Sequence, residues 1–149
     1  MLLKEICTTE VVFCNRATTV LEAARIMRKK HIGDLVIVDG PTDECVPVGL
    51  VTDRDIVVKV LGNELDAART TAGDIMGTPL VMATETEDSA TAIARMRAHG
   101  VRRLPVTGRG GALVGIVTLD DLLRKLGSEV EALIDIVSKE QDHEHRTAR

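Results

Sequence analysis

Two short stretches of the chain, "GLVTDRDIV" at residues 49–57 and "GIVTLDDLL" at residues 115–123, are nearly the same sequence. Gly, Val, Thr and the second Asp recur in place, and further positions exchange one aliphatic residue for another. A phrase that occurs twice in a chain of 149 residues indicates an internal repeat. The chain is therefore predicted to fold as two similar structural units.

The similarity extends well upstream of both phrases. An offset of 69 residues aligns Ile6 with Ile75 and Met27 with Met96. Beyond the loop at residues 39–49 the offset falls to 66, so this loop is three residues longer in the first copy. Loops absorb insertions while the elements around them do not, which is the behaviour expected of two structural repeats.

Each copy has the pattern of a β-α-β-β-α unit. A short apolar strand, at 11–13 and at 80–82, precedes an amphipathic helix, and Thr19 and Glu22 have the spacing of a capping box at the start of the first helix. Two apolar strands then lead into the repeated phrase, which opens a second helix, and their continuous apolar character predicts burial on both faces. The helix positions expected to face the core are Val20, Ala23, Ala24 and Met27 in the first copy and Ala92, Ile93 and Met96 in the second.

We therefore predict an α/β (α+β) fold of two such repeats packed as a pseudo-twofold pair, since one unit of about 55 residues is marginal alone. Ser128 and Glu131 have capping-box spacing and predict a separate C-terminal helix, whose apolar stripe packs on the domain or meets another subunit. The end of the chain, "DHEHR", is expected to be disordered. The predicted segments are repeat 1 at 1–61, a linker at 62–72, repeat 2 at 73–127, and a helix with a flexible tail at 128–149; the stripe consists of Val130, Leu133, Ile134 and Val137.

Composition argues against several classes of function. The net charge is -4 and the chain has one Phe, no Trp and no Tyr, so neither electrostatics nor aromatic stacking favours a nucleic-acid partner. No apolar run approaches a membrane span, and Lys4 and Glu5 stand where a signal peptide would be apolar, so we expect a cytoplasmic protein without membrane partners. Cys7, Cys14 and Cys45 have no CxxC spacing and are expected to be reduced thiols rather than zinc ligands.

The order of elements resembles a tandem CBS-domain pair, also called a Bateman module, of stand-alone bacterial type. The resemblance covers residues from about 6 to 127 and is carried by "HIGDLVIVD" with "GLVTDRDIV", and by "GVRRLPVTG" with "GIVTLDDLL". It implies two clefts related by a pseudo-twofold axis, which in many such pairs bind AMP, ADP, ATP or S-adenosylmethionine. It also implies further dimerisation into a disc-like assembly.

The repeated phrase has a chemistry of its own. Thr52 and Thr118 stand where a strand gives way to a helix, and the free N–H groups and dipole of a helix N-terminus favour an anion such as phosphate. Asp55 and Asp121 follow three residues later, and a carboxylate there is suited to accept hydrogen bonds from ribose hydroxyls. The same Thr-x-x-Asp spacing is that of a capping box, so both residues of each copy have a purely structural alternative.

The charged residues beside these corners differ between the copies. Arg102 and Arg103 stand where similar proteins often place a phosphate-binding Arg, although a solvated strand edge is the alternative. The first copy has Gly33 and Asp34 there, and a carboxylate at Asp34 would repel a phosphate or instead bind a hydroxyl or an amine. We therefore predict that the cleft with Thr118, Asp121, Arg103 and Arg102 binds a phosphorylated adenosine better than the cleft with Thr52, Arg54, Asp55 and Asp34.

Three functions remain open from the sequence. The first is a regulatory module that binds an adenosine nucleotide or S-adenosylmethionine, needs no cofactor or metal, and acts as a homodimer on an unknown protein target. The second is an enzyme, against which stands the lack of an identifiable base or nucleophile pair. The third is a structural or interaction module with vestigial clefts that acts through dimerisation and its tail helix. Because the chain has one Phe and no Trp or Tyr, adenine is expected to lie between aliphatic side chains.

Overall fold

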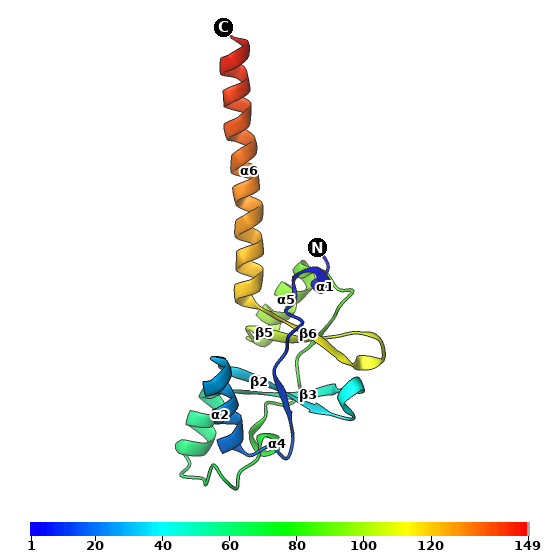
Figure 1. Cartoon of the computed structure of the whole chain (residues 1–149), viewed down its shortest axis with the longest axis vertical. Coiled ribbons are helices and arrows are strands. Elements are labelled where there is room, and N and C mark those ends of the chain that lie inside the picture. Colours follow the sequence, from blue (N-terminus) through cyan, green and yellow to red (C-terminus); the bar gives the residue numbers. More distant parts are fainter. Residues whose placement is uncertain (149) are drawn as a thin grey trace.

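The computed structural model describes residues 1–148 and contains two three-stranded sheets, one in each repeat (Figure 1). In both sheets the first strand pairs in parallel with the second, and the second pairs antiparallel with the third. The predicted α/β fold of two repeats with a C-terminal helix is confirmed. The strands are β1 (Phe13–Asn15), β2 (Asp34–Asp39) and β3 (Val46–Thr52) in one sheet, and β4 (Ala83–Thr84), β5 (Arg103–Thr107) and β6 (Leu113–Thr118) in the other.

The helices α2 (Val20–Lys30) and α5 (Ser89–His99) follow the first strand of each repeat. The predicted capping box of α2 is confirmed: the N–H of Glu22 donates to Thr19 Oγ1 at 3.1 Å, and the N–H of Thr19 donates to Glu22 Oε2 at 3.0 Å. Ile93 was expected in the core of the second repeat, but its side chain is 39% exposed. The second helix of repeat 1 is short, with α3 (Asp53–Asp55) continuing as the π-helical turn η2 (Ile56–Leu61).

The predicted first strands, 11–13 and 80–82, begin two to three residues too early compared with β1 and β4. The apolar residues in these stretches do contact the cores, since Val12 packs against the first core and Val81 against the second. An apolar pattern marks burial but does not show where the hydrogen-bonded ladder begins. The continuous apolar character of β2 is correctly explained, because its four central residues are buried.

The leading segments of the two repeats are exchanged in space. Helix α1 (Leu3–Ile6) precedes repeat 1 in the chain, yet Leu3 is fully buried in the core of repeat 2. Helix α4 (Ala72–Ile75) precedes repeat 2 and places Ala72 in the core of repeat 1. Isolated β-bridges join Thr8 to Ile116 and Leu50 to Gly77 at equivalent points of the two repeats. The core of each repeat therefore includes a residue from the segment that precedes the other repeat. The domain boundaries at 1–61 and 73–127 stay a prediction.

The glycine that opens each repeated phrase makes this exchange possible. A Cβ on Gly115 would lie 2.7 Å from Cys7 Sγ and 3.0 Å from the carbonyl oxygen of Thr8. A Cβ on Gly49 would overlap the side chain of Met76, which is the equivalent of Cys7 at the offset of 69. The crossing segments approach the strands β3 and β6 so closely that a side chain at either position does not fit. The two sheets also share a buried cluster of Val36, Val38, Cys45 and Ile116.

The C-terminal part of the chain differs from the prediction. Helix α6 (Leu119–Thr147) is one continuous helix of 29 residues, so Ser128 and Glu131 form no cap, and "DHEHR" is helical. Capping-box spacing also occurs between any two residues one turn apart inside a helix, which explains the wrong prediction. Figure 1 shows α6 projecting away from both sheets. No helix in residues 1–148 is both long and apolar enough to cross a membrane.

Candidate functional site

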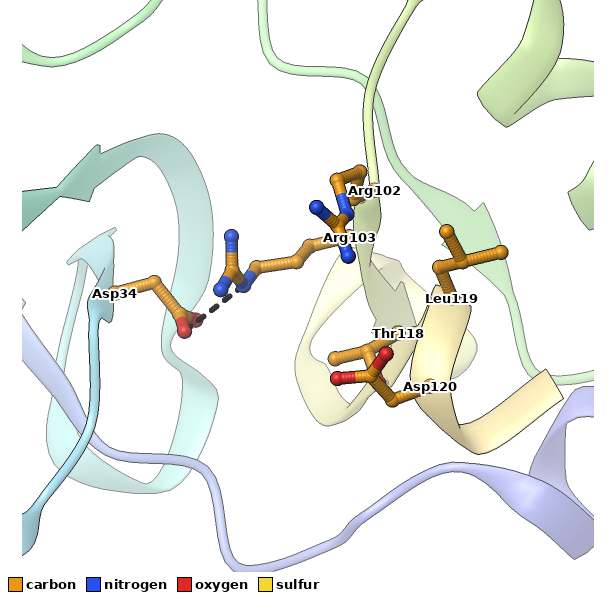
Figure 2. Close-up of a pocket in the computed structure, with 6 residues that line it drawn as sticks. All are labelled: Asp34, Arg102, Arg103, Thr118, Leu119 and Asp120. Carbon is orange, nitrogen blue, oxygen red and sulfur yellow. Dashed lines mark ion pairs between the residues drawn. The ribbon is translucent and has the colours of Figure 1, made fainter. Parts of the chain in front are cut away.

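An ion pair between the two repeats lies at the centre of the candidate site. Arg103, the first residue of β5, donates from Nε to Asp34 Oδ1 at 2.9 Å, and Asp34 is the first residue of β2 (Figure 2). The two residues are equivalent positions at the offset of 69, so the pair joins the repeats across their pseudo-twofold relation. The acidic residue that departs from the basic pattern in the first copy is therefore the partner of a basic residue in the second.

Burial sets the ionisation of Asp34. Its side chain is only 20% exposed, and this burial raises the pKa of the carboxyl above its usual range. Arg103 opposes the shift through its charge and its hydrogen bond, while the nearby charge of Asp53 adds slightly to it. The Arg103 guanidinium therefore favours the charged form of a carboxylate that is largely buried.

A polar pocket of about 230 Å³ opens beside this ion pair. In Figure 2 the Arg103 side chain extends toward Asp34, and the start of α6 lies on the opposite side of the pocket. Arg102 lies close to the backbone end of Arg103. The pocket combines two guanidinium groups with the carboxylates of Asp34 and Asp120. Arg103 is paired with Asp34, and the N–H groups of Thr118, Leu119 and Asp121 at the start of α6 already have acceptors, so Arg102 is the group here best suited to an anion. Its lining residues are Asp34, Arg102, Arg103, Thr118, Leu119 and Asp120.

A second, mainly apolar pocket of about 300 Å³ shares Arg102 and Arg103 with the first. Its walls come from the exchanged segment after α4, from β3, and from the residue that precedes the arginines. The shared arginines place an apolar cavity next to a polar one, as the base and the ribose phosphate of a nucleotide require. The other lining residues are Leu50, Thr52, Gly77, Pro79, Leu80, Val81 and Val101.

Both Thr-x-x-Asp corners form capping boxes. Thr118 Oγ1 accepts from the N–H of Asp121 at 3.2 Å, and Asp121 Oδ2 accepts from the N–H of Thr118 at 2.9 Å. Thr52 and Asp55 make the same two bonds at 3.1 and 2.9 Å. The structural alternative therefore holds in both copies, and each carboxylate has one oxygen occupied by the cap. Asp55 Oδ1 also pairs with Lys59 Nζ at 3.2 Å.

The predicted site residues separate into two groups. Asp34, Arg102, Arg103, Thr118 and Thr52 line the two connected pockets. The lining of these two pockets does not include Asp55, Asp121 or Arg54.

No sequence pattern predicts a site role for Asp120, Leu119 or the apolar wall around Leu80 and Val81. The one available signal is the apolar stretch before β4, whose pattern predicts a strand instead.

The cysteines take no part in this site. Cys7, Cys14 and Cys45 are free thiols, and burial raises the pKa of Cys7 and Cys14. Over residues 1–148 no group of three or more His, Cys, Asp or Glu side chains is placed to hold a metal ion.

Comparisons with known proteins agree with the repeat. The CBS domain family matches residues 3–62 and 72–128. The CBS domain-containing protein YhcV of Bacillus subtilis is 33% identical over 119 residues, which cover 80% of this chain and 81% of that protein. An uncharacterised protein of Methanopyrus kandleri is 36% identical over 120 residues, and the match spans 80% of this chain but 60% of the relative.

Solved structures of similar proteins include complexes with adenosine compounds. A CBS domain pair in complex with 5′-methylthioadenosine and S-adenosyl-L-methionine has a TM-score of 0.74 and 29% identity, covering 87% of this chain and 98% of the other. A CBS domain protein from Pyrobaculum aerophilum complexed with AMP has a TM-score of 0.71 and 27% identity, covering 82% and 90%. With both repeats matched and the predicted order of elements present in each, the chain belongs to the CBS-domain family and carries a tandem CBS pair.

Proposed function

We propose that the protein is a regulatory module that binds an adenosine-containing ligand, such as AMP, ADP, ATP or S-adenosylmethionine, without catalysing a reaction on it. The observation that carries this proposal is the pair of adjoining pockets, one apolar and one polar, that share Arg102 and Arg103. Structures with 27–29% identity hold AMP, 5′-methylthioadenosine or S-adenosyl-L-methionine, which supports the same ligand class here.

The apolar pocket is the proposed site for adenine. Leu80, Val81 and Val101 supply aliphatic surface, consistent with a chain that has one aromatic residue. Burying the flat faces of the base against such side chains is favourable in proportion to the apolar area removed from water. Backbone groups of the walls are proposed to make the hydrogen bonds that distinguish adenine.

The polar pocket is the proposed site for the ribose and the group beyond it. Arg102 has no ion pair among the described residues and is the proposed phosphate ligand, whereas Arg103 already pairs with Asp34. Thr118 and the N-terminus of α6 face the same space, and Asp120 is the proposed acceptor for ribose hydroxyls. Asp121 is proposed to hold the corner in shape through its cap. Thr52 lines the apolar pocket together with Arg102 and Arg103, so the corner of the first copy is proposed to contribute to this same site rather than to a separate, weaker one.

A ligand in the polar pocket is proposed to act through helix α6. The residues at the start of α6 line the polar pocket, so a ligand there contacts the base of the long projecting helix. We propose that binding changes how α6 is held against the domains and thereby alters the surface shown to a second subunit or a protein target.

The test is a thermal-shift and calorimetric titration with AMP, ADP, ATP, S-adenosylmethionine and inorganic phosphate. A ligand specific for the folded chain stabilises it by about 2.7 kcal/mol at a hundredfold excess over Kd. Arg102→Ala should remove most of this stabilisation by a phosphorylated ligand, and Arg97→Ala, on the exposed face of α5, is the matched control. If none of the adenosine compounds binds, the sensor proposal is wrong.

A second candidate function is an interaction module with vestigial clefts. The observation that favours it is the Arg103–Asp34 ion pair on one side of the polar pocket. The two opposite charges neutralise each other, so neither group needs a ligand as its partner. In that case no adenosine compound shifts the melting temperature, whereas substitutions on the exposed face of α6 change assembly.

A further inference from the structure

Helix α6 exposes an apolar face that no other part of residues 1–148 covers. Its first turns are anchored in the second core by Leu122, which is 2% exposed. Beyond this anchor the helix projects from the domains as a single rod (Figure 1). Seven large apolar side chains along it are 46–63% exposed, namely Leu123, Leu126, Val130, Leu133, Ile134, Ile136 and Val137. The predicted alternative in which this stripe packs on the domain is therefore wrong.

The apolar residues follow a heptad pattern in which positions a and d form the seam between helices. Leu123, Val130 and Val137 are seven residues apart and occupy position a, while Leu126 and Leu133 occupy position d. The positions that point away from such a seam are polar apart from one alanine, and they are Arg124, Lys125, Ser128, Glu131, Ala132, Asp135, Ser138 and Lys139. Ile134 at position e and Ile136 at position g widen the apolar face beside Leu133 and Val137. The seven-residue spacing of the a and d positions indicates a helical partner of the same periodicity.

We propose that this face is a dimer interface, in which α6 pairs with α6 of a second copy of the chain as a parallel, two-stranded coiled coil. A second copy supplies the same heptad spacing over the same length, so every seam residue meets its own equivalent. Valine at two of the three a positions with leucine at both d positions is the combination that favours two parallel strands. This inference does not depend on the proposed nucleotide function.

Charges along the helix agree with this arrangement and limit its length. In a parallel pair Glu129 at position g faces Ile134 of the other helix at position e, so no like charges meet beside the seam. Glu140 and Glu144 take the next d and a positions, where each would face its own copy. Like charges directly across a seam are unfavourable, so the apolar contact ends near Val137.

The base of the helix adds apolar surface next to the seam. A hollow of about 140 Å³ lies between α1, α5 and α6, and Leu126 and the exposed Ile93 are among its lining residues. The exposure of Ile93 has a simple explanation if the second copy covers this end of the interface. The contact then includes part of the domain surface, which strengthens a seam of little more than two heptads.

The first experiment measures the mass of the full chain by sedimentation equilibrium over a range of concentrations. The wild type should have twice the mass of one chain, and Leu133→Glu, at a seam position, should have the mass of one. Ala132→Glu adds the same charge one residue away on the outer face and should remain dimeric with equal helical content by circular dichroism. A monomeric wild type, a trimer or tetramer, a dimeric Leu133→Glu, or a monomeric Ala132→Glu would each overturn the proposal.

The orientation is tested by cysteine cross-linking. In the parallel pair Val137 faces Val137 of the second copy, whereas an antiparallel pair centred on Val130 places it opposite Leu123. Val137→Cys should therefore form a disulfide-linked dimer rapidly under mild oxidation, and Ser138→Cys, on the outer face, should not. Equal rates for the two variants, or no cross-link in Val137→Cys, would exclude the parallel arrangement.

Discussion

Replacement of Arg103 by alanine should destabilise the fold through Asp34 rather than through lost packing. The substitution leaves a carboxylate that is 20% exposed without its charged partner, and a hydrogen bond to a charged group contributes about 1.5–3 kcal/mol. The Arg103 side chain is itself 35% exposed, so water replaces part of the lost contact and reduces the effect. We expect a loss of about 1.5 kcal/mol in the free energy of unfolding near pH 7.

The loss should depend on pH in a definite direction. The pKa of Asp34 is raised by burial and held down by Arg103, so removal of the guanidinium raises it further. A carboxyl whose pKa in the folded chain lies above its unfolded value lowers stability as pH rises between those two values, because the folded chain binds more protons there. In the Arg103→Ala variant the pKa of Asp34 in the folded chain is higher, so the pH range over which stability falls extends further upward. The difference between wild type and variant should therefore be largest near neutral pH and should shrink as the pH approaches 3.8, the ordinary value of the group.

Urea unfolding at a fixed protein concentration measures this effect at about pH 7 and about pH 4.5. The double variant Asp34→Asn/Arg103→Ala replaces the unpaired carboxylate by a neutral amide and should recover much of the stability at neutral pH. Arg97→Ala, which removes one exposed positive charge from α5, is the control and should change little. Equal destabilisation by Arg103→Ala at both pH values, with no recovery in the double variant, would refute the reasoning.

Four further outcomes are expected. Gly49→Ala should lower the free energy of unfolding by about 1–3 kcal/mol in urea, because its Cβ overlaps Met76, and an unchanged midpoint would contradict the close crossing. Gly127→Ala lies in α6 with open space around its Cβ and should raise stability by about 0.5–1 kcal/mol, whereas a loss would indicate a break in the helix there. Thr118→Ala removes the cap of α6 and should cost about 1 kcal/mol, which thermal unfolding would detect or disprove. Saturating AMP should change the X-ray scattering profile of the protein, and superimposable profiles would remove support for signalling through α6.

The two repeats differ in a few charges at equivalent positions. Arg102 and Arg103 of the second copy correspond to Gly33 and Asp34 of the first, and this asymmetry is visible in the sequence. The structure adds that Asp34 and Arg103 do not belong to separate clefts but neutralise each other. Arg102 is left as the guanidinium of this cluster without an ion pair among residues 1–148, which is why it is the proposed phosphate ligand.

Local interactions explain which parts could be predicted from the sequence. Two copies of one pattern at an offset of 69 and then 66 residues, an apolar helix face at Val20, Ala23 and Met27, and a Thr–Glu capping box can be read from short stretches of sequence, and all three are present. Predictions failed where one local pattern fits two structures. The spacing of Ser128 and Glu131 fits either a helix start or two neighbours inside a helix, and only the continuous backbone of α6 distinguishes them.

The sequence by itself therefore determined the repeat, the order of elements in each unit and the chemical inequality of the two corners, because these depend on periodicity and residue type along the chain. Only the tertiary structure shows that Leu3 enters the core of repeat 2 and that Ala72 enters the core of repeat 1. It also shows that Asp34 pairs with Arg103, and that the apolar face of α6 is exposed. These facts depend on contacts between residues far apart in the chain. Such contacts follow from how the two sheets pack across their pseudo-twofold relation, and no local pattern specifies that packing.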